Sequence, residues 1–402
     1  MEYGHIAKIN DWLLDQGLRG LGEADLLAGF CERLRDAGIG IAQGAVFIDT
    51  LHPVLESQGF YWHANKTDEV EQQVFSRRES EDNAKRWRSS PFHFMSDNGL
   101  SELRIALDCQ GEARFSILDD LKQEGHSDYL ALIHQLSDKD AIGEMDSIYS
   151  RWSTRRPGGF AASDLEALRK LVPVLALGVK SATLRKIANS LVEVYLGSDP
   201  GRRVLEGRIA RGTVESIHTV LWYSDMENYT SLSEAVDSSK LIAMLNDYSE
   251  AVISAVYGAG GDVLKLIGDG TLAIFNHVDQ NLAAAAALRA RDDLQRRLSE
   301  LNERRREDGQ AITSAYVALH VGEVFYGNVG SDQRLDFTVI GPAVNEVCRI
   351  SSTCRAVGHS FVVSQEFAAL LSEPDRAHFA DLGPFQLKGV TNAKRLYARK
   401  PS

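Results

Sequence analysis

The stretch VLWYSDMENYTSLSE, from Val220 to Glu234, joins an apolar run to an acidic residue and a polar segment. The apolar residues Val220 to Tyr223 predict a buried strand, and the polar run after Asp225 is typical of a helix start. A carboxylate at the mouth of such a strand is costly to desolvate unless a positive group meets it. Two interpretations are open for Asp225 alone: a metal ligand, or an ordinary turn or helix-start residue.

A second acidic residue, Asp269, has a similar setting. It lies between two glycines in VLKLIGDGTLAIF, where two strand-like runs flank a tight turn and so predict a hairpin. If Asp225 and Asp269 converge, their hard oxygen atoms could hold divalent cations of the kind that accompany a nucleotide.

The bulk composition indicates an ordinary globular protein. The 402 residues suffice for about two domains, with 44% hydrophobic and 25% charged residues. A net charge of −12 argues against a nucleic-acid partner held by general electrostatics. The longest apolar run, residues 171–179, is too short to cross a bilayer, and the N-terminus lacks a signal-peptide pattern. We therefore expect no membrane insertion and a cytoplasmic chain whose cysteines are reduced core thiols without CxxC spacing: Cys31, Cys109, Cys348 and Cys354.

Three regions differ in pattern. Up to about Phe160, helical stretches such as EADLLAGFCERLRDAG mix with the strand-like GAVFIDTL and ELRIALDC. A long amphipathic helix is predicted from Ser163 to Leu196, with a kink at Pro173. From about Gly212 onward, short apolar strands alternate with helices, which favours an α/β region with an antiparallel sheet.

The long helix carries two apolar seams at three- and four-residue steps, separated by a phase slip. The first comprises Leu165, Leu168, Val172, Leu175, Val179 and Ala182, and the second Leu184, Ile187, Leu191 and Val194. Such seams suit either a helix packed on its own domain or a parallel pair of helices in a dimer.

Further polar residues follow the apolar strands of the third region. The amides of Met226 to Thr230 stand at a helix start, which is a natural phosphate site. Lys265 is flanked by Leu264 and Leu266, so it either projects into solvent or donates to a ring nitrogen of a base.

The stretch LDFTVIGPAVNEVCRI, residues 335–350, offers three more candidates. Thr338 is a small donor and acceptor on a strand, and Asn345 and Arg349 share one face if the next segment is a helix. Arg349 could neutralise charge on a transferring phosphoryl group, and Asn345 could orient a sugar. Lys388, in LKGV, could contact phosphate. Each of these residues could equally belong to a solvated surface.

Taken together, the motifs SDMENYT, GGDVLKLIGDGTLAIF, GNVGSDQRLDFTVIGPAVNEVCRI and LKGV occur in one order over the last half of the chain. This half closely resembles the catalytic domain of class III adenylate/guanylate cyclases, and Thr338 resembles the bacterial Thr-type subgroup. The resemblance implies a ferredoxin-like α+β domain over residues 213–402. The implied activity is conversion of ATP to 3′,5′-cyclic AMP and pyrophosphate.

The resemblance also implies a role for each motif residue. Asp225 and Asp269 match the ligands of two Mg²⁺ or Mn²⁺ ions per site, assisted by the Met226 carbonyl. Lys388 matches a triphosphate-contacting lysine. The residues of the phosphate-binding segment are Glu227, Asn228, Tyr229 and Thr230.

The base and ribose roles fall on four other residues. Lys265 and Thr338 match the base-selecting positions, and Asn345 and Arg349 match the pair that orients the ribose and stabilises the transition state. In this family one protomer supplies the aspartates and its twin supplies these four residues, so a homodimer with two composite sites is implied.

Departures from the commonest pattern leave the base less certain than the reaction. Many adenylate cyclases have Asp where Thr338 stands, and a Thr hydroxyl tolerates more than one base. A guanylate or pyrimidine nucleotide cyclase, or a catalytically silent nucleotide-binding regulator, are the alternatives.

The first half of the chain more diffusely resembles a GAF-type sensory domain, over residues 1–182, with a helical linker over residues 183–212. A PAS-like or unrelated α/β sensor is the alternative. An unknown small-molecule or redox signal is expected to act there and to regulate the cyclase. Its candidate pocket residues, which suit ordinary core and surface positions equally well, are Trp62, His63, Trp87, His93 and Phe94, and a haem or redox site would involve His63 and Cys109.

Overall fold

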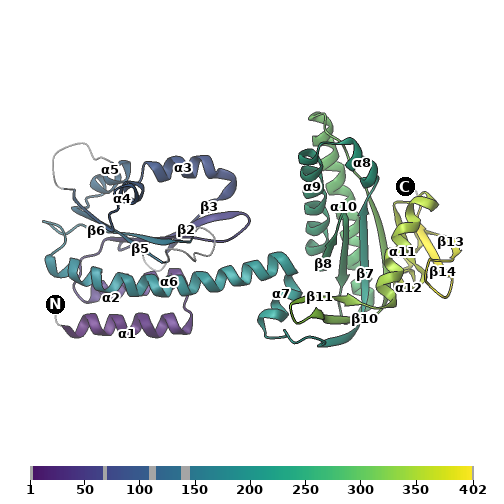
Figure 1. Cartoon of the computed structure of the whole chain (residues 1–402), viewed down its shortest axis with the longest axis horizontal. Helices are drawn as coiled ribbons and strands as arrows, with labels where there is room; N and C mark the ends of the chain where they lie inside the picture. Colours follow the sequence, from purple (N-terminus) through teal and green to yellow (C-terminus); the bar gives the residue numbers. More distant parts are fainter. Residues whose placement is uncertain (1–2, 67–69, 108–114, 137–144, 401–402) are drawn as a thin grey trace. The chain divides into compact units, whose positions relative to one another are not determined.

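The computed structural model describes residues 3–66, 70–107, 115–136 and 145–400, and it divides into two compact units (Figure 1). The first unit spans Met1–Leu191 and the second spans Val192–Ser402. Each has a mixed α/β architecture, with a hydrophobic core built on its own sheet. The fold class expected from the sequence, a ferredoxin-like α+β domain preceded by an α/β domain, is confirmed as far as the mixed α and β composition of both units. Cys109 lies outside the described residues.

The first unit contains a six-stranded sheet in the order β3-β2-β1-β6-β5-β4, in which every neighbouring pair is antiparallel. Its strands are β1 (Gln43–Asp49), β2 (Leu55–His63), β3 (Glu71–Ser76), β4 (Glu102–Ala106), β5 (Asp128–Gln135) and β6 (Ser147–Thr154). Its helices are α1 (Tyr3–Arg19), α2 (Glu23–Asp36), α3 (Ser80–Arg88), α4 (Pro91–Asp97), α5 (Ser116–Gln123) and most of α6 (Ala162–Leu196), with a short 3₁₀ turn at Arg77–Glu79.

Helices cover both faces of this sheet. The apolar sides of α1, α2 and α6 share one core with the sheet, and α4 and α5 share a smaller core on the opposite face (Figure 1). Of the expected pocket residues, Trp62 is buried in the larger core. Trp87 lies on α3, and its ring is edge-on to the rings of His93 on α4 and Tyr149 on β6. Trp62 is therefore a core residue.

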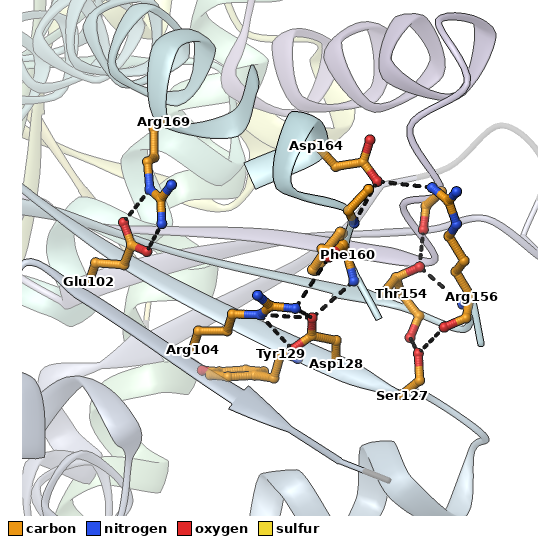
Figure 2. Close-up of polar contacts among 12 residues, drawn as sticks. Glu102, Arg104, Ser127, Asp128, Tyr129, Thr154, Arg156, Phe160, Asp164 and Arg169 are labelled. Atoms are coloured by element: carbon orange, nitrogen blue, oxygen red, sulfur yellow. Dashed lines mark hydrogen bonds and ion pairs between the residues drawn. The ribbon is translucent and has the colours of Figure 1, made fainter. Parts of the chain in front are cut away.

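A buried carboxylate fastens the beginning of α6 to this sheet (Figure 2). Asp128, which is 1% exposed, accepts hydrogen bonds from the guanidinium of Arg104 at 2.7 Å and from the backbone amide of Phe160 at 2.9 Å. Asp164, in the first turn of α6, accepts from Arg156 at 3.2 Å. A buried charge is tolerated because these donors replace its water.

The long helix is confirmed as α6, and it contains Pro173 within its length. All six residues of the first predicted seam are buried against the first unit. The second seam is less covered: Ile187 is buried, but Val194 is 51% exposed. The first seam thus packs on its own unit, and a pairing of helices through the second seam stays a prediction.

The second unit has an eight-stranded sheet in the order β13-β14-β12-β10-β7-β9-β8, with β11 paired to β10. Its strands are β7 (Val214–Met226), β8 (Asp262–Ile267), β9 (Gly270–Phe275), β10 (Ala315–Ser331), β11 (Arg334–Ile340), β12 (Phe361–Ser364), β13 (Phe379–Phe385) and β14 (Lys394–Arg399). Its helices are α7 (Ser198–Leu205), α8 (Tyr229–Ala235), α9 (Ser238–Gly258), α10 (Gln280–Glu307), α11 (Pro342–Val357), α12 (Gln365–Ala368) and α13 (Glu373–Ala377). The predicted antiparallel sheet is confirmed except for one parallel pair, β10 with β12.

Alternation along β7 explains why residues 220–223 are apolar without interruption. Val220 and Trp222 face the core under α9 and α10, whereas Leu221 faces the core under α11. A strand buried on both faces needs apolar residues at every position. By the same alternation Asp225 lies on the α11 side of the sheet, at the end of the strand.

Among the residues that the structure describes, no helix combines the length and the apolar character that crossing a bilayer requires.

Candidate active site

The two aspartates singled out in the sequence come together at one end of the second sheet. Asp225 is the penultimate residue of β7. Asp269 occupies the turn between β8 and β9, and β9 pairs with β7. The two carboxyl groups lie close enough for Asp269 to raise the pKa of Asp225, and Asp269 Oδ2 accepts a hydrogen bond from the backbone amide of Met226 at 3.2 Å. The hairpin expected around Gly268 to Gly270 is therefore what carries Asp269 to Asp225.

The turn depends on its glycines. Gly268 has a φ of +64°, which side chains other than glycine rarely adopt. At Gly270 an added Cβ would lie 2.4 Å from the hydroxyl oxygen of Tyr223, which is too close for any real contact. The Gly-Asp-Gly sequence thus allows the backbone to pass close to β7 while Asp269 projects toward Asp225.

The electrostatics of this pair fit a divalent cation. Burial, together with the neighbouring carboxyl of Asp269, raises the pKa of Asp225 to about 7. When both carboxylates of a half-buried pair are ionised, their negative charges repel each other. A divalent cation that takes the place of the shared proton removes this repulsion. No group of three or more His, Cys, Asp or Glu side chains capable of holding a metal occurs within the described ranges. The side-chain ligands of a cation here would thus be these two aspartates.

The segment after Asp225 differs in part from the phosphate site expected there. The amide of Met226 is engaged by Asp269, and the amide of Glu227 donates to the carbonyl of Ser314 at 2.8 Å. Because these two amides already donate hydrogen bonds within the protein, the expected phosphate site is reduced to the amides of Asn228, Tyr229 and Thr230. Asn228 precedes α8 with a left-handed φ of 59°.

Lys265 lies on β8 and is exposed, but it does not simply extend into solvent. Its ammonium forms an ion pair with Asp336 on β11, a residue that the sequence did not single out. Thr338, two residues further along β11, is nearly buried at 9% exposure. Because alternate residues of a strand share a face, Asp336 and Thr338 lie on the same side of β11.

The helix predicted after Gly341 is confirmed as α11, and Asn345 and Arg349 are both exposed on it. The opposite side of α11 packs on the sheet through Val347 and Ile350. Asn345 and Arg349 therefore share the solvent-facing side, as the four-residue spacing predicted.

A charged network that sequence reasoning missed holds α11 in place. Glu346 accepts from Nε2 of the buried His320 at 2.9 Å and lies 2.8 Å from the ammonium of Lys394. His320 Nδ1 lies 2.8 Å from the hydroxyl of Ser364. The network joins α11 to three strands, β10, β12 and β14. Its only sequence signal was a Glu on the otherwise apolar side of a helix.

We expect the Glu346→Gln substitution to lower the free energy of unfolding by about 1–3 kcal/mol at pH 7. The hydrogen bond from His320 and the charge of Lys394 hold the pKa of Glu346 down at about 2, below its ordinary value of 4.5. A depressed pKa stabilises the fold above pH 4.5, and this stabilisation is lost as pH falls toward 2. Urea unfolding at a series of pH values should show the difference between wild type and variant shrinking below pH 4.5. Glu303→Gln on the exposed side of α10 is the control, and equal losses in both variants would contradict the role of the network.

The remaining predicted residue, Lys388, lies on an exposed turn between β13 and β14. In the described part of the chain, no hydrogen bond or ion pair links Lys388, Asn345 or Arg349 to either aspartate. The single chain thus presents separate groups: the aspartates, the Lys265 pair, and the exposed side of α11.

Comparison with known proteins finds a family match within this second unit. Residues 214–398 match the family described as the adenylate and guanylate cyclase catalytic domain. An adenylate cyclase of Anabaena cylindrica is 30% identical over 164 residues, covering 41% of this chain and 33% of that protein. Adenylate cyclase 1 of Rhizobium meliloti is 27% identical over 176 residues, covering 44% of this chain and 26% of that protein.

Among solved structures, the adenylyl cyclase CyaB from P. aeruginosa is 23% identical and covers 47% of this chain and 96% of that chain, with a TM-score of 0.42. The chain spans about a third or less of the length of the curated relatives described above. The family match, residues 214–398, falls within the unit that holds Asp225 and Asp269. Residues 214–398 of this chain are accordingly similar to the catalytic domains of nucleotide cyclases.

Proposed function

We propose that this protein is an adenylate cyclase that converts ATP to 3′,5′-cyclic AMP and pyrophosphate. The observation that carries the proposal is the convergence of Asp225 and Asp269 within a domain that matches the cyclase family. The two relatives described above are both named adenylate cyclases. The strand order β10-β7-β9-β8, with α9 and α10 as the connections, also supports the ferredoxin-like architecture expected from the resemblance.

In the proposed reaction the ribose 3′-oxygen bonds to the α-phosphorus while the bond from that phosphorus to the leaving pyrophosphate breaks. The hydroxyl proton passes to solvent. Arg349 stabilises the charge that develops on the α-phosphoryl group, and Asn345 orients the ribose. Lys265 donates to the base, Thr338 lies beside it, and Lys388 contacts the triphosphate. The amides of Asn228, Tyr229 and Thr230 supply further donors to the phosphates.

Asp225 and Asp269, with the Met226 carbonyl, are the residues that would hold two Mg²⁺ or Mn²⁺ ions. When bound, these ions lower the pKa of the ribose hydroxyl and neutralise the triphosphate. The position of the Asp269 carboxylate is fixed by the hydrogen bond from the Met226 amide and by the glycine turn. The pair of carboxylates is therefore held in place by the protein itself.

The separation of the polar groups in one chain supports a composite site in a homodimer. Lys265, Asn345 and Arg349 are exposed, as groups that complete a partner's site must be. One protomer would supply the aspartates, and its partner would supply the lysine, asparagine and arginine, so that the dimer has two sites.

We also propose that the first unit, as a GAF-like domain over residues 1–182, regulates the cyclase through the linker at residues 183–212. The fastening of α6 by Asp128 and Asp164 supports this, since a change in the first sheet would reach the helix directly (Figure 2). The exposed second seam around Val194 offers a surface whose pairing could change.

A product assay with ATP, GTP, CTP and UTP, each with and without Mn²⁺, tests the proposal. We expect cyclic AMP from ATP in the presence of the metal and much slower turnover of the other nucleotides. A preference for GTP, CTP or UTP would identify the same chemistry with another base, and no cyclic product from any nucleotide would refute the activity. Repeating the assay on a chain that begins at Thr183 tests regulation, and unchanged kinetics would indicate that the first unit has no regulatory role.

A further inference from the structure

The pairing of Lys265 with Asp336 brings together residues from two separate elements of the second unit. Lys265 lies on β8 and Asp336 on β11, two strands that are not neighbours in the sheet but come into contact there. The side chains of both residues are 43% exposed, so solvent and a ligand can both reach them. An exposed ion pair of this kind contributes little to stability. The stability of the fold alone therefore does not account for the carboxylate of Asp336 beside Lys265.

The face of β11 that carries Asp336 is the one that carries Thr338. Phe337 and Val339, which alternate with them, are buried in the core under α11. On β8 the register shifts between Val263 and Lys265, so strict alternation does not place Lys265, and its position is given by its ion pair with Asp336. Asp336 and Thr338 consequently lie on the side of β11 directed away from this core, where Asp336 is the more exposed of the two and meets the ammonium of Lys265.

The hydrogen-bonding chemistry of the pair is complementary to one type of base edge. A lysine ammonium has three donors, of which Asp336 takes one, and a carboxylate can only accept. If Lys265 donates to a ring nitrogen, the neighbouring carboxylate accepts from an exocyclic amino group beside that nitrogen. Adenine presents this combination. Guanine presents a carbonyl oxygen where adenine has its amino group, and a carbonyl repels a carboxylate.

We propose that Asp336 is a specificity-determining residue, which orients Lys265 and accepts the exocyclic amino group of the adenine base. This inference rests on the proposed cyclase function, and it assigns to Asp336 a role that the family resemblance gives to the position of Thr338. Thr338 then closes the pocket beside the base, and its hydroxyl is not the main discriminating group.

The test compares Asp336→Asn with the wild type in the full chain, with kcat/KM measured for both ATP and GTP in Mn²⁺. An asparagine amide can present either an oxygen or an NH₂ group, so it no longer favours an amino group over a carbonyl. We expect kcat/KM for ATP to fall about 10- to 100-fold while that for GTP changes little. The ratio of the two values is the decisive quantity.

Two further variants make the test specific. Asp332→Asn removes the same charge from the same hairpin, where Asp332 is 88% exposed and faces Arg211 at 3.5 Å, and it should leave the ratio unchanged. Asp336→Glu keeps the carboxylate and should retain a preference for ATP. Circular dichroism confirms that each variant is folded.

The possible outcomes separate this inference from the proposed function. A wild-type chain that cyclises no nucleotide refutes the function itself. An active wild type whose Asp336→Asn variant keeps its ATP to GTP ratio overturns the role of Asp336, whether overall turnover is retained or falls equally for both nucleotides. A selective loss with ATP, reversed by glutamate, supports it.

Discussion

Replacing Asp225 with asparagine should abolish metal-dependent turnover, with a loss of at least about 10²-fold. Mutation of a residue that only orients a metal ligand already lowers metal affinity or activity by up to about 10²-fold, and the loss of a ligand itself should cost at least as much. The substitution removes one of two carboxylates that face each other at the end of β7. An amide keeps the shape of the side chain but not its negative charge, so a divalent cation is held far more weakly.

The fold of the Asp225→Asn variant should persist. Burial and the neighbouring Asp269 already raise the pKa of Asp225 to about 7, so a neutral group at this position relieves repulsion. Activity in Mn²⁺ and the thermal unfolding midpoint are the two measurements. Asp237→Asn, at a position that is 82% exposed before α9, is the matched control and should keep full turnover. Near-normal turnover of the Asp225 variant would refute the metal assignment.

Replacing Arg349 with alanine should cost roughly 10²-fold or more in kcat, since it removes the cation that we propose to stabilise the transferring phosphoryl group. Arg349 is exposed on α11 and makes no part of the core, so its loss leaves the packing of Val347 and Ile350 intact. Arg355→Ala, which removes an exposed arginine from the last turn of the same helix, is the control.

Mixing the two inactive variants tests the composite site. A heterodimer of Asp225→Asn with Arg349→Ala has one site with both substitutions and one site with neither. If subunits exchange freely, half of the dimers are mixed, so about a quarter of wild-type activity should return. Arg349→Ala mixed with itself supplies the baseline. No recovery, with subunit exchange verified by differently tagged chains, would show that each site is built from one protomer.

The local structure of the catalytic unit was largely predictable from sequence patterns. The apolar run at Val220 gave a strand, the glycines around Asp269 gave a hairpin, and the spacing of Asn345 and Arg349 gave one face of a helix. Each of these depends on interactions within a few residues: steric limits on φ, alternation along a strand, and the helical repeat. Such short-range constraints are written directly in the order of the residues.

Contacts between distant strands were not predictable in the same way. The approach of Asp225 to Asp269 was anticipated only as a condition, and the pairing of Lys265 with Asp336 was not anticipated at all. The network of Glu346, with its partners on β10 and β14, was also missed, because a single charged residue on a helix looks the same whether solvent or a buried histidine faces it.

The sequence by itself determined which elements form in the catalytic unit and which residue types could bind a metal, a phosphate or a base. Only the tertiary structure decided which of those residues meet, because strand order and helix packing bring together groups that lie dozens of residues apart. The tertiary structure placed a carboxylate beside Lys265 and reduced the candidate phosphate-binding amides to those after Glu227. The physical reason is that a hydrogen bond or ion pair depends on distance in space, which the spacing along the chain does not fix.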